Sequence, residues 1–241
     1  MAGHSKWSNI KHRKGRQDAK KGKVFTKVSK EIFQAVRNGG ENQETNAALR
    51  MALEKAKQVN MPNDNVERTI KKALGNVDGI TYEEIVYEGY APHGIAVYVE
   101  TLTENKNRTA ADIRLAFNKN GGNLGENGCV SFMFSRRGWL IYEKLAEIDE
   151  DEIMLTALEA GAEDVTFSED AVEIFTQAEE MQDVKKVFKE IASLELASAE
   201  AAMVPAVKTA LKEEDLDEVM QLIEALEDND DVQRVAHSAV L

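Results

Sequence analysis

Residues 138–203 have the sequence GWLIYEKLAEIDEDEIMLTALEAGAEDVTFSEDAVEIFTQAEEMQDVKKVFKEIASLELASAEAAM, in which strand and helix patterns alternate. Alternation of apolar and polar residues predicts strands at 139–142, 165–167, 172–175 and 199–203. Apolar residues that recur every three or four positions predict helices at 150–160 and 180–191. The resulting order, β-α-β-β-α-β, is that of a ferredoxin-like unit. We therefore expect this stretch to form a complete α/β domain.

The sequence on either side of this unit carries two further groups of elements. Before it we expect strands at 84–88 and 94–100, a helix capped by Thr109, and a strand at 130–134. After it we expect a strand at 206–210, a helix at 215–226 and a strand at 232–236, with Pro205 at the return crossing. Each group is too small to fold alone. They are predicted to pair as one split α/β domain.

Three amphipathic helices precede the first strand. The first has its apolar face between Phe25 and Val36, the second lies at 49–59, and the third begins at Asn63 and ends at Gly75. The predicted fold class is α+β with three domains. These are a basic arm and helical domain at 1–75, a split α/β domain at 76–135 and 205–241, and an inserted acidic ferredoxin-like domain at 136–204.

Charge is distributed very unevenly along the chain. Residues 1–75 carry 17 basic and 7 acidic groups, whereas residues 76–241 carry 13 basic and 36 acidic groups, so that the net charge of -13 hides a basic start. Electrostatic fields decay over about 8 Å at physiological salt, so the local charge governs binding. A basic arm on an acidic body predicts contact with nucleic-acid phosphates.

The arm combines cations that neutralise phosphate with one aromatic ring that can stack on a base. The candidate nucleic-acid-binding residues are Lys6, Trp7, Lys11, Arg13, Lys14, Arg16, Lys20, Lys21, Lys23 and Lys27. A solvated basic tail without a dedicated partner is the alternative, although its charges would repel one another strongly.

Other chemistry is not indicated by the sequence. A single cysteine and four scattered histidines provide neither a disulfide nor a metal site, and no acid, base and nucleophile are paired at a recognisable spacing. We expect a non-enzymatic cytoplasmic protein without a cofactor, metal, membrane span or small-molecule substrate. The glycine-rich run 121–128 lacks the ending of a phosphate loop, so it is either a turn-rich connection or an RNA or protein contact. The acidic clusters in 143–183 are either solvated surface or a docking face for a basic protein.

Several blocks of the chain, in order, resemble the YebC/PmpR family. The blocks are MAGHSKWSNIKHRK at 1–14, NMP at 60–62, YEGYAP at 87–92, ETLT at 100–103, NRTA at 107–110, GGNLG at 121–125, LED at 226–228 and DVQ at 231–233. The resemblance implies a helical N-terminal domain and a ferredoxin-like domain interrupted by another α/β domain. The split domain is then ferredoxin-like as well.

The resemblance also implies a regulator of gene expression that binds nucleic acid, described in the family as a DNA-binding transcriptional regulator. The alternative is a translation factor associated with the ribosome and its RNA, because relatives in mitochondria activate translation. On that alternative, Asn107 and Arg108 are candidate secondary contacts together with the glycine run, provided that neighbouring loops bring them together. The chain shows no tight helix-turn-helix connection for reading bases, since seven residues, 37–43, separate the first two helical patterns.

Overall fold

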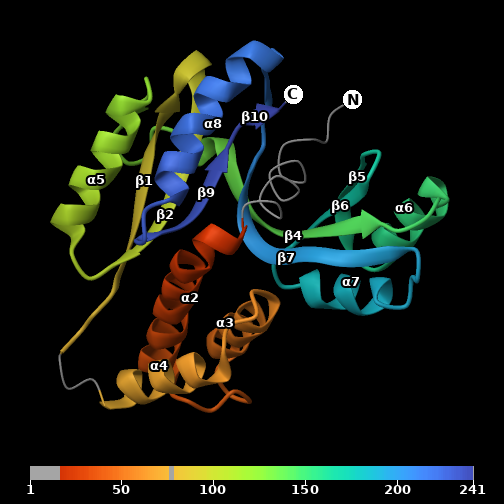
Figure 1. Ribbon diagram of the computed structural model, residues 1–241. Coiled ribbons are helices and arrows are strands. Elements are labelled where there is room, and N and C mark those ends of the chain that lie inside the picture. The colour runs from red at the N-terminus through yellow and green to blue at the C-terminus, as the bar shows by residue number, and fades with distance from the viewer. Residues whose placement is uncertain (1–16, 76–78, 241) are drawn as a thin grey trace.

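The computed structural model describes residues 17–75 and 79–240, which form three groups of elements (Figure 1). One group is a bundle of three helices, and each of the other two is a four-stranded antiparallel sheet with helices on one face. The α+β fold class predicted from the sequence is confirmed. Each group has its own hydrophobic core, because each buries a separate set of apolar side chains.

The helical bundle (residues 17–75) consists of α2 (Gln17–Gly39), α3 (Ala47–Gln58) and α4 (Asn63–Gly75). Val28, Ile32 and Leu49 lie fully buried in its core. Asn46 joins the first two helices. Its side-chain oxygen accepts from the Leu49 N–H, and its amide nitrogen donates to the carbonyl oxygens of Ala35 in α2 and of Gly40 just after α2. The bundle therefore has a defined corner between α2 and α3.

The split sheet has the strand order β3-β1-β2-β9. Its elements are β1 (Glu83–Ala91), β2 (Ile95–Thr103), α5 (Lys106–Lys119), β3 (Asn123–Leu124), α8 (Glu213–Glu227) and β9 (Val232–His237). A short helical turn, η1 (Pro92–Gly94), joins the two central strands, and β8 (Thr209–Ala210) pairs with β10 (Ala239–Val240) beside the sheet. The core lies between β2, α5 and α8, with Val97, Phe117 and Leu222 fully buried.

The inserted sheet has the order β5-β6-β4-β7, which is the ferredoxin-like arrangement predicted for these residues. It contains β4 (Phe134–Lys144), α6 (Glu150–Glu159), β5 (Ala162–Phe167), β6 (Ala171–Thr176), α7 (Met181–Phe188) and β7 (Leu194–Pro205). Side chains of β4 and β6 pack against α6 and α7, as at Leu140, Ile174 and Val184. In the split sheet the β1–β2 hairpin is central, whereas here the β5–β6 hairpin lies at one edge.

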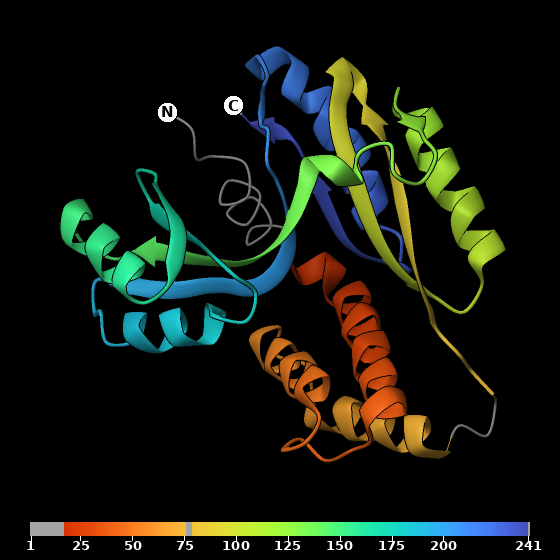
Figure 2. The ribbon, with the colours of Figure 1, turned by 180° about the vertical axis from the view of Figure 1, so that it is seen from behind.

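Two long strands of the inserted sheet, β4 and β7, lead from the split sheet into the inserted sheet. β4 and β7 pair from Phe134 and Pro205 at one end to Lys144 and Leu194 at the other, and Figure 2 shows them running together out of the split sheet. The domain boundaries predicted at 135/136 and 204/205 fall inside these strands. The division into three domains stays a prediction, but the connection between the sheets is a hydrogen-bonded ribbon.

Some predicted elements are wrong in detail. The strand predicted at 130–134 is a helical turn, η2 (Ser131–Met133), and the strand predicted at 206–210 is only the two-residue β8. Asn105, rather than Thr109, caps α5, with its side-chain oxygen accepting from the Arg108 N–H. The described part of α2 already includes Gln17, well before the apolar face at 25–36, so part of the predicted arm is helical.

Candidate nucleic-acid interface

The predicted binding residues fall into three groups, two of which lie in the described structure. Lys6, Trp7, Lys11, Arg13, Lys14 and Arg16 lie outside the described residues. Lys20, Lys21, Lys23 and Lys27 belong to the first turns of α2, and Asn107 and Arg108 belong to the first turn of α5. The lysines of α2 and the arginine of α5 thus come from elements far apart in sequence.

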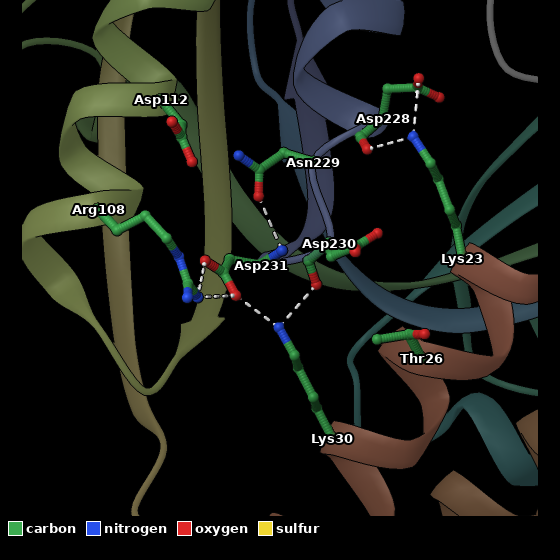
Figure 3. A pocket seen from close by; sticks show the side chains of 9 residues that line it. All are labelled: Lys23, Thr26, Lys30, Arg108, Asp112, Asp228, Asn229, Asp230 and Asp231. Atoms are coloured by element: carbon green, nitrogen blue, oxygen red, sulfur yellow. Dashed lines mark hydrogen bonds and ion pairs between the residues drawn. The ribbon is translucent and has the colours of Figure 1, made fainter.

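Three lysines of α2 contact the turn that follows α8. We call residues 227–231 the acidic turn. Lys23 Nζ lies 2.9 Å from a carboxylate oxygen of Asp228, and Lys27 Nζ donates to the Glu227 carbonyl oxygen at 2.6 Å. Lys30 Nζ donates to the Asp230 carbonyl at 2.9 Å (Figure 3). Spacings of four and three place these lysines on one face of α2, so this face holds the helical bundle against the split sheet.

Asp231 is the centre of this contact. Its carboxylate accepts from Lys30 Nζ at 2.5 Å, from the Thr109 hydroxyl at 2.7 Å and from Arg108 Nη2 at 2.9 Å, although its side chain is only 4% exposed. Its own backbone N–H donates to the Asn229 side chain at 2.8 Å. Arg108, a predicted contact for nucleic acid, is therefore an ion-pair partner within the chain (Figure 3).

The negative charge of Asp231 is compensated by cationic side chains of the protein itself. Burial alone would raise the pKa of Asp231, but the bonds from Lys30, Thr109 and Arg108 lower it from 3.8 to about 2. The surrounding depression, about 380 Å³ in volume, is lined by both lysines and aspartates. The opposite charges of this lining pair with each other and so connect two parts of the chain. A phosphate-binding site would instead be lined mainly by cationic side chains.

The low pKa of Asp231 makes the stability of the protein sensitive to acid. A carboxyl group with a pKa of 3.8 when unfolded and about 2 when folded stabilises the fold above pH 3.8. This contribution should be lost progressively as the pH falls from about 4 to 2. Urea unfolding at several pH values measures it, and Asp231→Asn should flatten the dependence in this window. An unchanged pH dependence in that variant would assign the acid sensitivity to other carboxyl groups.

Asn107 and the glycine run are not brought together. They lie at opposite ends of α5, which has 14 residues and so is about 20 Å long. The run packs on β1, where a Cβ atom at Gly122 would lie 2.8 Å from the Tyr90 carbonyl oxygen. A Cβ atom at Gly125 would lie 2.5 Å from the sulfur of Cys129, which follows the run in the same loop. Close approach therefore explains these two glycines, and the run serves as a packed connection.

Glu88 is a residue whose role the sequence analysis missed. Its buried carboxylate accepts from the backbone N–H groups of Gly128, Val130 and Ser131, at 2.7 to 2.8 Å. Burial acts to raise the pKa of Glu88, yet these N–H groups hold it below its ordinary value. The only sequence signal is its place in the block YEGYAP, because its partners are about 40 residues away. Glu88 fixes the end of the glycine run.

The described part of the chain shows no group of three or more metal-ligating side chains. Within the same residues, no helix is both long and apolar enough to span a membrane. Ion pairs of Lys23, Lys30 and Arg108 join α2 and α5 to the acidic turn.

Known proteins match the chain along nearly its whole length. Residues 5–76 match the family described as "TACO1/YebC protein N-terminal domain", and residues 82–239 match "TACO1/YebC second and third domain". Proteins called "Probable transcriptional regulatory protein" from Anoxybacillus flavithermus and "Probable transcriptional regulatory protein YrbC" from Bacillus subtilis are 52% and 51% identical. The alignments cover 99% and 98% of this chain and 97% and 98% of those proteins.

A crystal structure of a conserved hypothetical protein from Aquifex aeolicus is also similar. It has 43% sequence identity and a TM-score of 0.80, over 92% of this chain and 91% of that one. The similarity in sequence and in structure therefore extends over all three groups of elements.

Proposed function

The chain belongs to the TACO1/YebC family, and from this premise we propose that it is a non-enzymatic regulator of gene expression that binds nucleic acid through its N-terminal arm. The names of its relatives support regulation of transcription, which makes DNA the first candidate target. The resemblance found in the sequence, to the YebC/PmpR family, is confirmed. The expected location is the cytoplasm.

The uneven charge carries this proposal. The first 75 residues hold 17 basic against 7 acidic groups, and the remaining residues hold 36 acidic against 13 basic groups. Phosphates would be attracted to the first part and repelled by the second, so a nucleic acid would bind in one orientation. Since Lys23 and Lys27 already contact the acidic turn, the cations at positions 6–16 should contribute most of the binding.

A translation factor that binds ribosomal RNA is the second candidate, and one observation favours it. The connection from the end of α2 at Gly39 to the start of α3 at Ala47 takes seven residues, too long for the tight turn of a helix-turn-helix. Helices α2 and α3 therefore do not form a tight helix-turn-helix for reading bases in the major groove. Contacts with phosphates and sugar, which also suit folded RNA, need no such element.

Replacing Lys11, Arg13, Lys14 and Arg16 by alanine should weaken nucleic-acid binding by about a hundredfold at 0.15 M salt. Each phosphate contact adds about 0.7 to 0.9 to the slope of log K against log salt, so the slope should fall by about 3. Fluorescence anisotropy with labelled duplex DNA and with ribosomal RNA fragments measures both quantities. These substitutions keep α2 whole, whereas deletion up to residue 23 would remove its first turns and the Lys23–Asp228 pair.

A matched variant removes the same charge elsewhere in the helical bundle. Its four alanines replace exposed basic residues of α3 and α4, namely Lys57, Arg68, Lys71 and Lys72. This control should leave the slope nearly unchanged. Equal losses in both variants would show that total charge, and no dedicated arm, governs binding.

Crosslinking in growing cells separates the two targets. The tagged protein is irradiated with ultraviolet light, and the attached DNA and RNA are sequenced together, with the variant lacking the four arm cations as a control. Promoter DNA that depends on the arm would support the transcriptional role, and ribosomal RNA would support the translational role. Recovery of neither, or equal recovery by the variant, would contradict the proposal.

A further inference from the structure

Phe132 is the most exposed large apolar side chain among the described residues, at 76%. It lies in the turn η2, between the packed glycine run and β4. Its neighbours in sequence are mostly covered, since Val130 is fully buried and Phe134 is 7% exposed. An isolated exposed phenylalanine is common on protein surfaces, so exposure alone does not indicate a role.

The backbone around Phe132 is unusually well fixed for an exposed turn. Glu88 binds the N–H groups of the residues just before it, and the Met133 N–H donates to the Val130 carbonyl oxygen at 2.9 Å. The Tyr90 hydroxyl donates to the Cys129 carbonyl oxygen at 3.1 Å. A buried carboxylate that accepts several hydrogen bonds from one turn holds that turn in one conformation. Phe132 therefore projects from a preorganised support.

A second chain segment lies beside this turn and adds an apolar side chain and a cation. The Ala206 N–H donates to the Met133 carbonyl oxygen at 2.8 Å, so the residues after β7 run next to η2. Val207, 62% exposed, and Lys208 follow directly. The Lys208 ammonium lies 5.9 Å from the centre of the Phe175 ring.

Arg136 provides a second cation, four residues after Phe132 on β4. Its side chain is exposed, and within residues 17–75 and 79–240 it forms no ion pair with a carboxylate. The part of the chain after residue 75 has 36 acidic and 13 basic groups, so two cations within a few residues of the bonded Met133 and Ala206 are a local exception. An exposed aromatic ring together with cations on the neighbouring chain segments is the combination that binds single-stranded nucleic acid.

We propose that Phe132 is a stacking platform for an unpaired base of single-stranded nucleic acid, with Arg136 and Lys208 neutralising the adjacent phosphates. This inference rests on the proposed function and adds a second contact site, outside the helical bundle. The phenyl ring carries no hydrogen-bonding group, so the site accepts any base. Bases stacked and paired within a duplex are not available to it, which makes the contact selective for single strands.

Replacing Phe132 by alanine should weaken binding of a labelled single-stranded 12-mer of uridines by about tenfold, with an unchanged salt slope. Stacking contributes to affinity without releasing counterions, which explains the unchanged slope. Phe132→Trp should restore affinity to within about threefold of the original. Arg136→Ala with Lys208→Ala should instead lower the slope by about 1.4. Leu155→Ala is the matched control, because Leu155 is also exposed, at 59%, but lies on α6.

Crosslinking locates the contact. With 5-bromouridine in the oligonucleotide, ultraviolet light should attach it to the peptide that contains Phe132, as identified by mass spectrometry. Equal affinity of the original protein and of Phe132→Ala for the oligonucleotide would overturn this inference while leaving the proposed function intact. The inference would also fail if only duplexes bind, or if Phe132→Ala abolishes capture of a protein partner but not of RNA. No binding of any nucleic acid by the original protein would overturn both proposals.

Discussion

Replacing Asp231 by alanine is expected to lower the free energy of unfolding by about 3 to 5 kcal/mol. The carboxylate accepts hydrogen bonds from Lys30, Thr109 and Arg108. Its loss would leave the largely buried Lys30 ammonium group with the Asp230 carbonyl oxygen but without a compensating negative charge. A charge that stays buried after its partner is removed costs more than the pair contributed. Urea denaturation followed by circular dichroism measures the loss.

Two further variants separate this effect from the general loss of a surface charge. Asp228→Ala removes an aspartate three positions earlier, whose ion pair with Lys23 is 45% exposed on both sides, and should cost less than about 1 kcal/mol. Asp231→Asn keeps the shape of the side chain and one acceptor oxygen. Its loss of unfolding free energy should therefore lie between those of Asp231→Ala and Asp228→Ala. If Asp231→Ala were no more destabilising than Asp228→Ala, Asp231 would not be the centre of the contact between α2 and the split sheet.

Replacing Glu88 by alanine is expected to cost about 3 kcal/mol, the second largest loss. Three backbone N–H groups, those of Gly128, Val130 and Ser131, would lose their acceptor, and each unsatisfied buried group costs about 1 to 3 kcal/mol. The loss of stability should lie near the lower end of the summed cost of the three N–H groups, because Gly128 is exposed and water can reach its N–H. Thermal and urea unfolding measure the change.

Glu126→Ala is the matched control for Glu88, because Glu126 lies in the same loop but is exposed. It should change stability by less than about 0.5 kcal/mol. Hydrogen exchange adds a local readout, since the amides of Val130 and Ser131 should exchange faster only in Glu88→Ala. Protection of those amides in both variants would mean that other contacts hold the turn.

Elements with strong local patterns could be predicted from the sequence. The helix at 63–75, the hairpin around Pro92 and the order of the inserted sheet all agree with the structure. The exceptions have identifiable causes. Residues 130–134 have the composition of a strand, but Glu88 binds two of the N–H groups that a strand would use, so a helical turn forms.

Contacts between distant residues could not be predicted. The first turns of α2 lack an apolar face, and the helix there is supported by lysines that bind a turn about 200 residues away. Thr109 is typical of a helix cap, yet its hydroxyl donates to Asp231, 122 residues away. One sequence contains no pattern that pairs such positions. The arm at 6–16 remains a prediction from charge alone.

The split sheet also has a consequence for synthesis of the chain. Its core combines Val97 and Phe117 from the middle of the sequence with Leu222 and Val232 from near the end. As the nascent chain emerges, the helical bundle and the inserted sheet can be completed while the apolar face of the β1–β2 hairpin is covered only by α5. That face closes only when α8 and β9 have been made, so a premature stop after residue 212 would leave the hairpin open to aggregation.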